Sequence, residues 1–253
     1  MSIKRKLVFT VSLLCLMSVA LSASASTDSV LSRWRKTVKI MDEDNMGFVE
    51  FTVTYYSAEY IQALVQKEAK ANLWTKDEEE NYKYQLLKTL QLERNIPIFI
   101  EINNYGSALR MAPFGDQVEL WINGKSYSPV DYDKRFNFKL TGKREGFVYF
   151  PRYNEETGQP LLAKAKTIKF SIDGGVSPIT MGRRPSIDFL WDVYRDNPDQ
   201  FFTGKAAERL ELDRLIIRLG NLKEQRGDIQ KQLDELDAEL ARIQSRIDEL
   251  QSK

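Results

Sequence analysis

The C-terminal part of the sequence carries a heptad repeat, which limits the possible fold more than any other feature. From Leu212 to Leu250, apolar residues recur at alternating spacings of three and four. With Leu212 at position a, eleven of the twelve a and d positions hold Leu or Ile. The a positions are Leu212, Leu219, Arg226, Leu233, Leu240 and Ile247, and the d positions are Leu215, Leu222, Ile229, Leu236, Ile243 and Leu250. Such a narrow seam between polar flanks predicts a helix that pairs with another helix in a coiled coil.

The partner in this predicted coiled coil is either a second copy of the chain or another helical protein. In an antiparallel pair the g positions of the two helices face each other. One register then matches Glu211 with Arg246 and Arg218 with Glu239, whereas a parallel pair sets Arg218 against Lys223. We therefore expect a homodimer in which the antiparallel orientation is slightly favoured.

Two other arrangements of residues 206–253 remain open from the sequence. The segment could be a single helix packed on the surface of the preceding domain, or a hairpin that turns at Gly220-Asn221. The heptad phase continues through Gly220 and Gly227, which both fall at outward-facing b positions. This continuity argues against the hairpin, although each glycine costs a helix about 1 kcal/mol relative to alanine.

The N-terminus has the three parts of a cleavable secretory signal. Residues 1–6 include three basic side chains, residues 7–21 are uncharged and mostly apolar, and small residues follow up to Ala25. An apolar stretch of this length is shorter than the roughly 18 to 20 residues that span a bilayer. We predict a signal peptide at 1–25, export to the periplasm or the medium, and no transmembrane segment after cleavage. An uncleaved anchor is the alternative.

The composition excludes most common catalytic and metal sites from the mature chain. The sequence has no histidine, and cleavage would remove its one cysteine, Cys15. Zinc sites with nitrogen and sulfur ligands, and Ser-His-Asp or Cys-His catalysis, therefore cannot form. Loss of three basic residues changes the net charge from +1 to −2, so no basic field attracts nucleic acid. We predict no enzyme, no cofactor and no metal centre.

Two kinds of acidic motif leave narrow exceptions. The pairs Asp131/Asp133 and Glu155/Glu156 could serve a carboxylate-based hydrolase if two carboxyls faced each other across a sugar. The turn Asp42–Gly47 is similar to the start of a calcium loop, but Met46 and Val53 stand where oxygen ligands are needed. Solvated carboxylates and a hairpin turn are the simpler interpretations.

Short runs of alternating apolar and polar residues in 26–177 predict β-strands with one buried face. Seven or eight such strands lie between residues 34 and 173, and Asn123-Gly124 is a two-residue hairpin signal. The run from Phe136 to Leu140 is one of the predicted strands. We predict a mainly β fold: an immunoglobulin-like antiparallel β-sandwich, with a helical pair at about 57–94 inserted between its second and third strands.

Local signals place the remaining helices. Ser57 can cap the first inserted helix, and Thr75 with Glu78 forms a capping box for the second. Residues 178–205 are predicted to be a linker with a short amphipathic helix around 187–194.

Trp121 and Tyr149 are the candidate ligand-binding residues. Each alternates with apolar neighbours expected to point inward, so each is predicted on an outer sheet face. Exposed aromatic rings bind glycans or protein partners, although covering helices would explain them equally well. The predicted function is an exported, non-catalytic interaction or structural module of the cell envelope that assembles through its coiled coil. The alternative is a glycan- or ligand-binding protein that uses these aromatic residues.

The signal predicts a mature N-terminus at Ser26, because the small residues Ala23 and Ala25 occupy the third and first positions before the cleavage site. Mass spectrometry of the protein isolated from its native host measures this terminus. An intact Met1 in the cytoplasmic fraction would contradict export.

Overall fold

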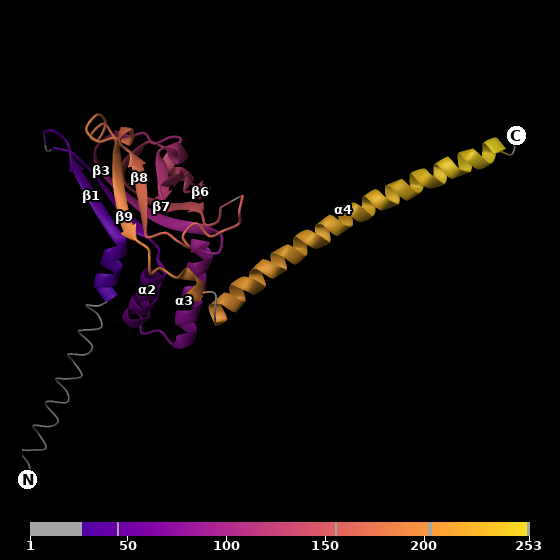
Figure 1. Ribbon diagram of the computed structural model, residues 1–253, viewed down its shortest axis with the longest axis horizontal. Coiled ribbons are helices and arrows are strands. Elements are labelled where there is room, and N and C mark those ends of the chain that lie inside the picture. Colours follow the sequence, from indigo (N-terminus) through magenta and orange to yellow (C-terminus); the bar gives the residue numbers. More distant parts are fainter. Residues whose placement is uncertain (1–26, 45, 155, 202–203, 252–253) are drawn as a thin grey trace, which may run out of the picture. The chain divides into compact units, whose positions relative to one another are not determined.

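The computed structural model describes residues 27–44, 46–154, 156–201 and 204–251 (Figure 1). The predicted signal peptide, 1–25, lies outside the described residues. The chain divides into two compact units, residues 1–203 and 204–253. We call the first unit the β domain. Within the described ranges, no helix combines the length and the apolarity needed to cross a bilayer.

The first sheet of the β domain has five antiparallel strands in the order β1-β2-β3-β7-β6. These strands are β1 (Arg35–Met41), β2 (Phe48–Tyr55), β3 (Asn95–Leu109), β7 (Leu140–Pro151) and β6 (Asp131–Tyr132). The long strands β3 and β7 form its centre, and buried and less buried residues alternate along much of both. That alternation places one face of the sheet toward an apolar core.

The second sheet has four antiparallel strands in the order β5-β4-β8-β9. They are β5 (Lys125–Tyr127), β4 (Val118–Ile122), β8 (Thr167–Asp173) and β9 (Ser186–Asp192). The predicted turn between β4 and β5 is confirmed. Asn123 and Gly124 both have positive φ angles, 51° and 82°, as a tight two-residue hairpin turn requires.

The two sheets share one hydrophobic core. Phe150 of β7 meets Phe170 of β8 with ring centroids 5.9 Å apart, and Tyr55 of β2 lies 6.1 Å from Trp191 of β9. The buried Trp191 indole N–H donates to the carbonyl oxygen of Trp34, at 2.9 Å. The core is therefore built from residues far apart in the sequence, and both sheets are needed to enclose it.

The helical pair is confirmed between β2 and β3, at one end of the sheets (Figure 1). It comprises α2 (Ala58–Ala71) and α3 (Lys76–Leu90). The Ser57 hydroxyl accepts from the Tyr60 N–H, so Ser57 caps α2 as predicted. Thr75 and Glu78 exchange the two hydrogen bonds of a capping box at the start of α3.

The predicted linker at 178–205 is wrong over much of its length. Most of its predicted short helix at 187–194 belongs instead to the strand β9, which pairs with β8 along its whole length. The preceding loop is also ordered: Ser177 and Thr180 are fully buried, and the Thr180 hydroxyl donates to the Gly174 carbonyl oxygen at 2.5 Å. These residues belong to the β domain rather than to a spacer.

The predicted strand from Phe136 to Leu140 is also wrong. Residues Lys134–Asn137 form the 3-10 helix η2, which the Asp133 carboxylate caps, and β7 begins only at Leu140. Phe136 is buried and stacks on Phe114, whereas Phe138 is 66% exposed. Phe136 and Phe138, whose spacing of two residues predicts one face of a strand, therefore lie in different environments, one buried and one exposed.

The second unit contains one continuous helix, α4 (Lys205–Gln251), 47 residues long. At 1.5 Å per residue it extends about 70 Å. Because α4 runs unbroken through Gly220 and Gly227, the alternative of a hairpin turning at Gly220-Asn221 is excluded.

Gly174 is predicted to be essential for packing of the loop before β9. A Cβ atom at this position would lie 1.8 Å from the backbone oxygen of Arg184. We expect Gly174→Ala to lower the free energy of unfolding of the β domain by about 3 kcal/mol, because backbone must move to admit the methyl group. Urea unfolding followed by tryptophan fluorescence measures this. Gly220→Ala, with nothing within 4 Å, should leave the same transition unchanged; equal effects of the two would contradict this packing.

Candidate functional site

The apolar seam of α4 is exposed along its whole length. Its eleven Leu and Ile side chains are between 41% and 64% exposed, from Ile247 to Leu240. Arg226, the one charged residue of the seam, is exposed as well. A helix with this seam buries its apolar surface only by contact with another surface. The seam is therefore a candidate interaction surface.

The two candidate ligand-binding aromatics do not converge. Trp121 lies on β4 in the second sheet, and the Lys169 ammonium sits 5.0 Å from its ring centroid. Tyr149 lies on β7 in the first sheet, where its hydroxyl donates to the Thr89 carbonyl oxygen of α3 at 2.9 Å. Trp121 thus contacts a residue of its own sheet and Tyr149 a residue of helix α3, and the two rings, which belong to different sheets, do not line one site.

The acidic motifs are engaged in local structure. Asp131 accepts from the Lys134 ammonium at 3.1 Å, and Asp133 pairs with the Arg135 guanidinium at 2.6 Å. The hydrogen bond from Arg135 holds the pKa of Asp133 below its usual value. Glu155, one member of the other pair, lies outside the described residues.

Two acidic side chains of the turn between β1 and β2 also form local hydrogen bonds and ion pairs. The Asp42 carboxylate accepts from the Met46 N–H at 2.9 Å, and Glu43 pairs with Arg183 at 2.6 Å. Within the part of the chain that the structure describes, no three His, Cys, Asp or Glu side chains gather where they could hold one metal ion.

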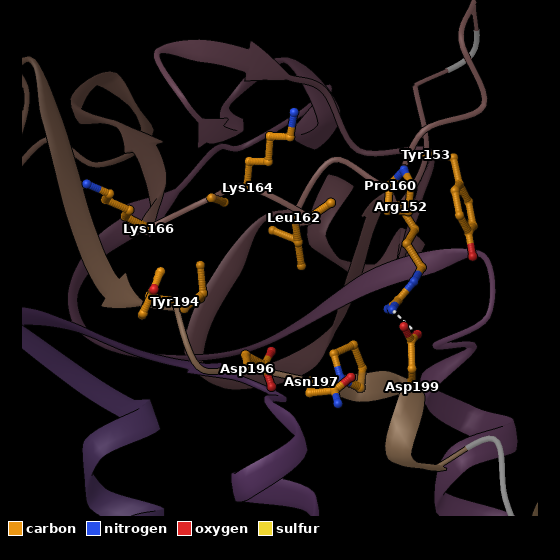
Figure 2. A pocket seen from close by; sticks show the side chains of 14 residues that line it. Arg152, Tyr153, Pro160, Leu162, Lys164, Lys166, Tyr194, Asp196, Asn197 and Asp199 are labelled. Carbon is orange, nitrogen blue, oxygen red and sulfur yellow. Dashed lines mark hydrogen bonds and ion pairs between the residues drawn. The ribbon is translucent and has the colours of Figure 1, made fainter.

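A hollow of about 590 Å³ opens in the β domain (Figure 2). It is lined by residues of two segments, 152–166 after β7 and 193–199 after β9. We call it the Arg152 hollow. Sequence reasoning missed it, because its polar residues come from separate segments and form no motif.

Asp196 joins three parts of the chain beside this hollow. Its carboxylate accepts from the Tyr55 hydroxyl at 2.5 Å and from the Ala58 N–H, at the start of α2, at 2.8 Å. Burial raises the pKa of Asp196, while these two hydrogen bonds and the charge of Arg152 oppose that rise. Burial and the adjacent carboxylate also raise the pKa of Tyr55 well above its usual value.

Arg152 carries a buried positive charge at the hollow. Its side chain is only 8% exposed, and one of its nitrogens lies 3.4 Å from an oxygen of Asp199. Asp199 belongs to the 3-10 helix η4 (Pro198–Phe201), and its side chain is 79% exposed. Figure 2 shows this contact at the side of the hollow.

Tyr55→Phe is predicted to destabilise the β domain in a pH-dependent way. Loss of this partly buried hydrogen bond to a carboxyl group should lower the free energy of unfolding by about 1.5 to 3 kcal/mol at a pH where the carboxyl is ionised. Because the Tyr55 donor lowers the pKa of Asp196, the folded variant takes up a proton at higher pH than the wild type. Its deficit should therefore shrink as the pH falls toward the usual carboxyl pKa of about 4.

Chemical denaturation at several pH values checks this prediction. Tyr194→Phe is the matched control, because Tyr194 lines the same hollow but is 71% exposed. A pH-independent deficit in Tyr55→Phe would show that the hydroxyl does not act through Asp196.

No protein-family model matches the chain, and no curated protein matches it either. The chain is similar to one solved structure, a crystal structure described as a novel protein of unknown function from Burkholderia pseudomallei K96243. The sequence identity is 12% and the TM-score is 0.38. That likeness covers 71% of this chain and 89% of the other.

Proposed function

We propose that the protein is an exported, non-catalytic interaction module of the cell envelope that assembles through an antiparallel coiled coil formed by two copies of α4. The observation that carries this proposal is the exposed seam of Leu and Ile on one continuous helix. Export rests on the sequence of residues 1–25, and the envelope role on the combination of export, a β domain and a helix that requires a partner.

Burial of the seam supplies the driving force for pairing. Complete burial of a Leu or Ile side chain contributes about 1.5 to 3 kcal/mol relative to exposure. Eleven half-exposed side chains therefore offer enough free energy to offset the ordering of two helices. The glycines at 220 and 227 face away from the seam and leave it continuous.

Charge pattern favours a second copy in antiparallel orientation. The register that opposes Glu211 to Arg246 also opposes Arg218 to Glu239, and symmetry makes each pair occur twice. In the single helix, Arg246 already contacts Glu249 at 2.5 Å and Glu211 lies 3.9 Å from Arg214. Interhelical pairs must compete with these contacts, and exposed pairs contribute only about 0.2 to 1 kcal/mol each. They select the orientation, while the apolar seam stabilises the dimer.

We also propose that the β domain is an immunoglobulin-like sandwich. Without β1, the strand orders are β2-β3-β7-β6 and β5-β4-β8-β9. These correspond to the orders A-B-E-D and C′-C-F-G of immunoglobulin-like domains. In this correspondence β1 precedes strand A, and the helical pair is inserted between strands A and B. The alternative function, a ligand-binding protein that uses Trp121 and Tyr149, has less support because those residues lie on different sheets.

Self-association through the seam is tested by light scattering on the chain that begins at Ser26. We expect a dimer, and we expect Leu236→Asp, at a d position, to shift it toward monomer because a carboxylate cannot be buried unpaired. Ala238→Asp places the same charge at an outward f position and should leave the dimer intact. A wild-type monomer at high protein concentration would reject the proposal.

Helix orientation is tested by disulfide formation between Glu211→Cys and Arg246→Cys variants. The chain from Ser26 onward contains no other cysteine. In the antiparallel register, a mixture of the two single variants forms a crosslinked heterodimer on oxidation. Crosslinking of each variant to itself, without the heterodimer, would establish a parallel pair.

A further inference from the structure

We propose that the Arg152 hollow binds a small organic anion, a ligand that presents a carboxylate or phosphate group to the Arg152 guanidinium. The site is distinct from the α4 seam and involves different residues. Arg152 supplies the positive charge of this site, and neither nearby carboxylate, Asp196 or Asp199, fully neutralises it.

The positive charge of Arg152 is buried but weakly compensated. Asp199 approaches it at 3.4 Å, well beyond the roughly 2.7 to 2.9 Å of a strong charge-assisted hydrogen bond. The Asp199 carboxylate is also mostly solvated. No other hydrogen bond from this guanidinium reaches a residue that the structure describes. A buried cation normally has closer partners, because desolvation of an ion costs several kcal/mol.

The second carboxylate near the hollow is committed elsewhere. Asp196 accepts hydrogen bonds from Tyr55 and from the first N–H of α2, and the helix N-terminus carries partial positive charge. The Tyr55 hydroxyl, the Ala58 N–H and the helix dipole of α2 therefore all stabilise the negative charge of Asp196. Asp196 influences the field at Arg152 without forming an ion pair with it.

The geometry of Arg152 suits an oxyanion. A guanidinium presents several N–H donors in one plane, which match the two oxygens of a carboxylate or of a phosphate edge. Asp199 already places one carboxylate oxygen against this group. An incoming anion would take that place and release the exposed Asp199 side chain to water.

The remaining lining can hold the body of a small molecule. The volume of about 590 Å³ lies within the range of about 300 to 1,000 Å³ typical of small-molecule sites. Leu162 and Val193 contribute apolar surface, and Tyr153 and Tyr194 are 41% and 71% exposed. Exposed tyrosine rings can stack on a sugar or another flat ligand. The ligand therefore combines an anionic group with a ring-sized body.

Two lysines add positive charge at the rim. Lys164 and Lys166 line the hollow, and their ammonium groups extend outward in Figure 2. They attract an anion from solution, and Arg152 makes the contact. With Arg152 they give three positive charges against the two carboxylates of Asp196 and Asp199.

Calorimetric titration of the full chain with glucose, glucuronate and glucose 6-phosphate tests the proposal. The three probes share a ring and differ in having no charge, a carboxylate or a phosphate. We expect one or both anions to bind and glucose not to bind; whichever anion binds more tightly identifies the preferred group. Equal binding of glucose and the anions, or binding of none, overturns the proposal. If none of the three probes binds, the Arg152–Asp199 pair is a purely structural contact.

Two variants locate the binding. Asp199→Asn removes the competing carboxylate and should tighten anion binding about 1.4- to 5-fold, the range expected for an ion pair whose carboxylate is largely exposed. Asp116→Asn makes the same charge change on η1 (Phe114–Asp116) and should leave the affinity unchanged. Arg152→Gln should abolish binding, and its far-ultraviolet spectrum verifies folding. Equal effects of the two aspartate variants, or retained binding in folded Arg152→Gln, would refute the assignment.

Discussion

The β domain depends on one apolar core that neither sheet can form alone. Every main strand contributes alternate side chains to it, and aromatic contacts such as Phe150 with Phe170 join the sheets across it. The mature chain predicted here has no cysteine to form disulfides, so burial of these side chains is the main source of its stability. The long central strands β3 and β7 set the extent of the core, and the shorter strands complete it.

Polar contacts at one end of the sheets position the segment that follows β9. Asp196 connects the segment after the last strand to Tyr55, at the end of β2, and to the start of α2. The same segment contains Asp199, whose carboxylate contacts Arg152, the residue that follows β7. Two carboxylates of one short segment, Asp196 and Asp199, thus contact regions that lie far apart in the sequence. These contacts lie beside the hollow and connect the start of α2 to the segment after β9.

Local signals in the sequence predicted local structure well. Ser57, the Thr75–Glu78 pair and Asn123-Gly124 act within a few residues of themselves, and all three predictions are confirmed. The strand β9 was missed because Ile187, Leu190, Trp191 and Tyr194 also follow helical spacing. Only pairing with β8 shows that Ile187, Phe189 and Trp191 are the buried set. The hollow could not be predicted, since the contact between Arg152 and Asp199 spans 47 residues and depends on the tertiary fold.

The outer strands of both sheets are poor templates for adding another strand. At the ends of the first sheet, β1 carries Arg35, Lys36 and Lys39, and β6 has only two residues. At the ends of the second, β9 carries Asp188 and Asp192, and β5 has only three residues. Charged or very short edges discourage edge-to-edge aggregation. The β domain therefore resists edge-to-edge aggregation, and a neighbouring copy would not readily add a strand to either sheet.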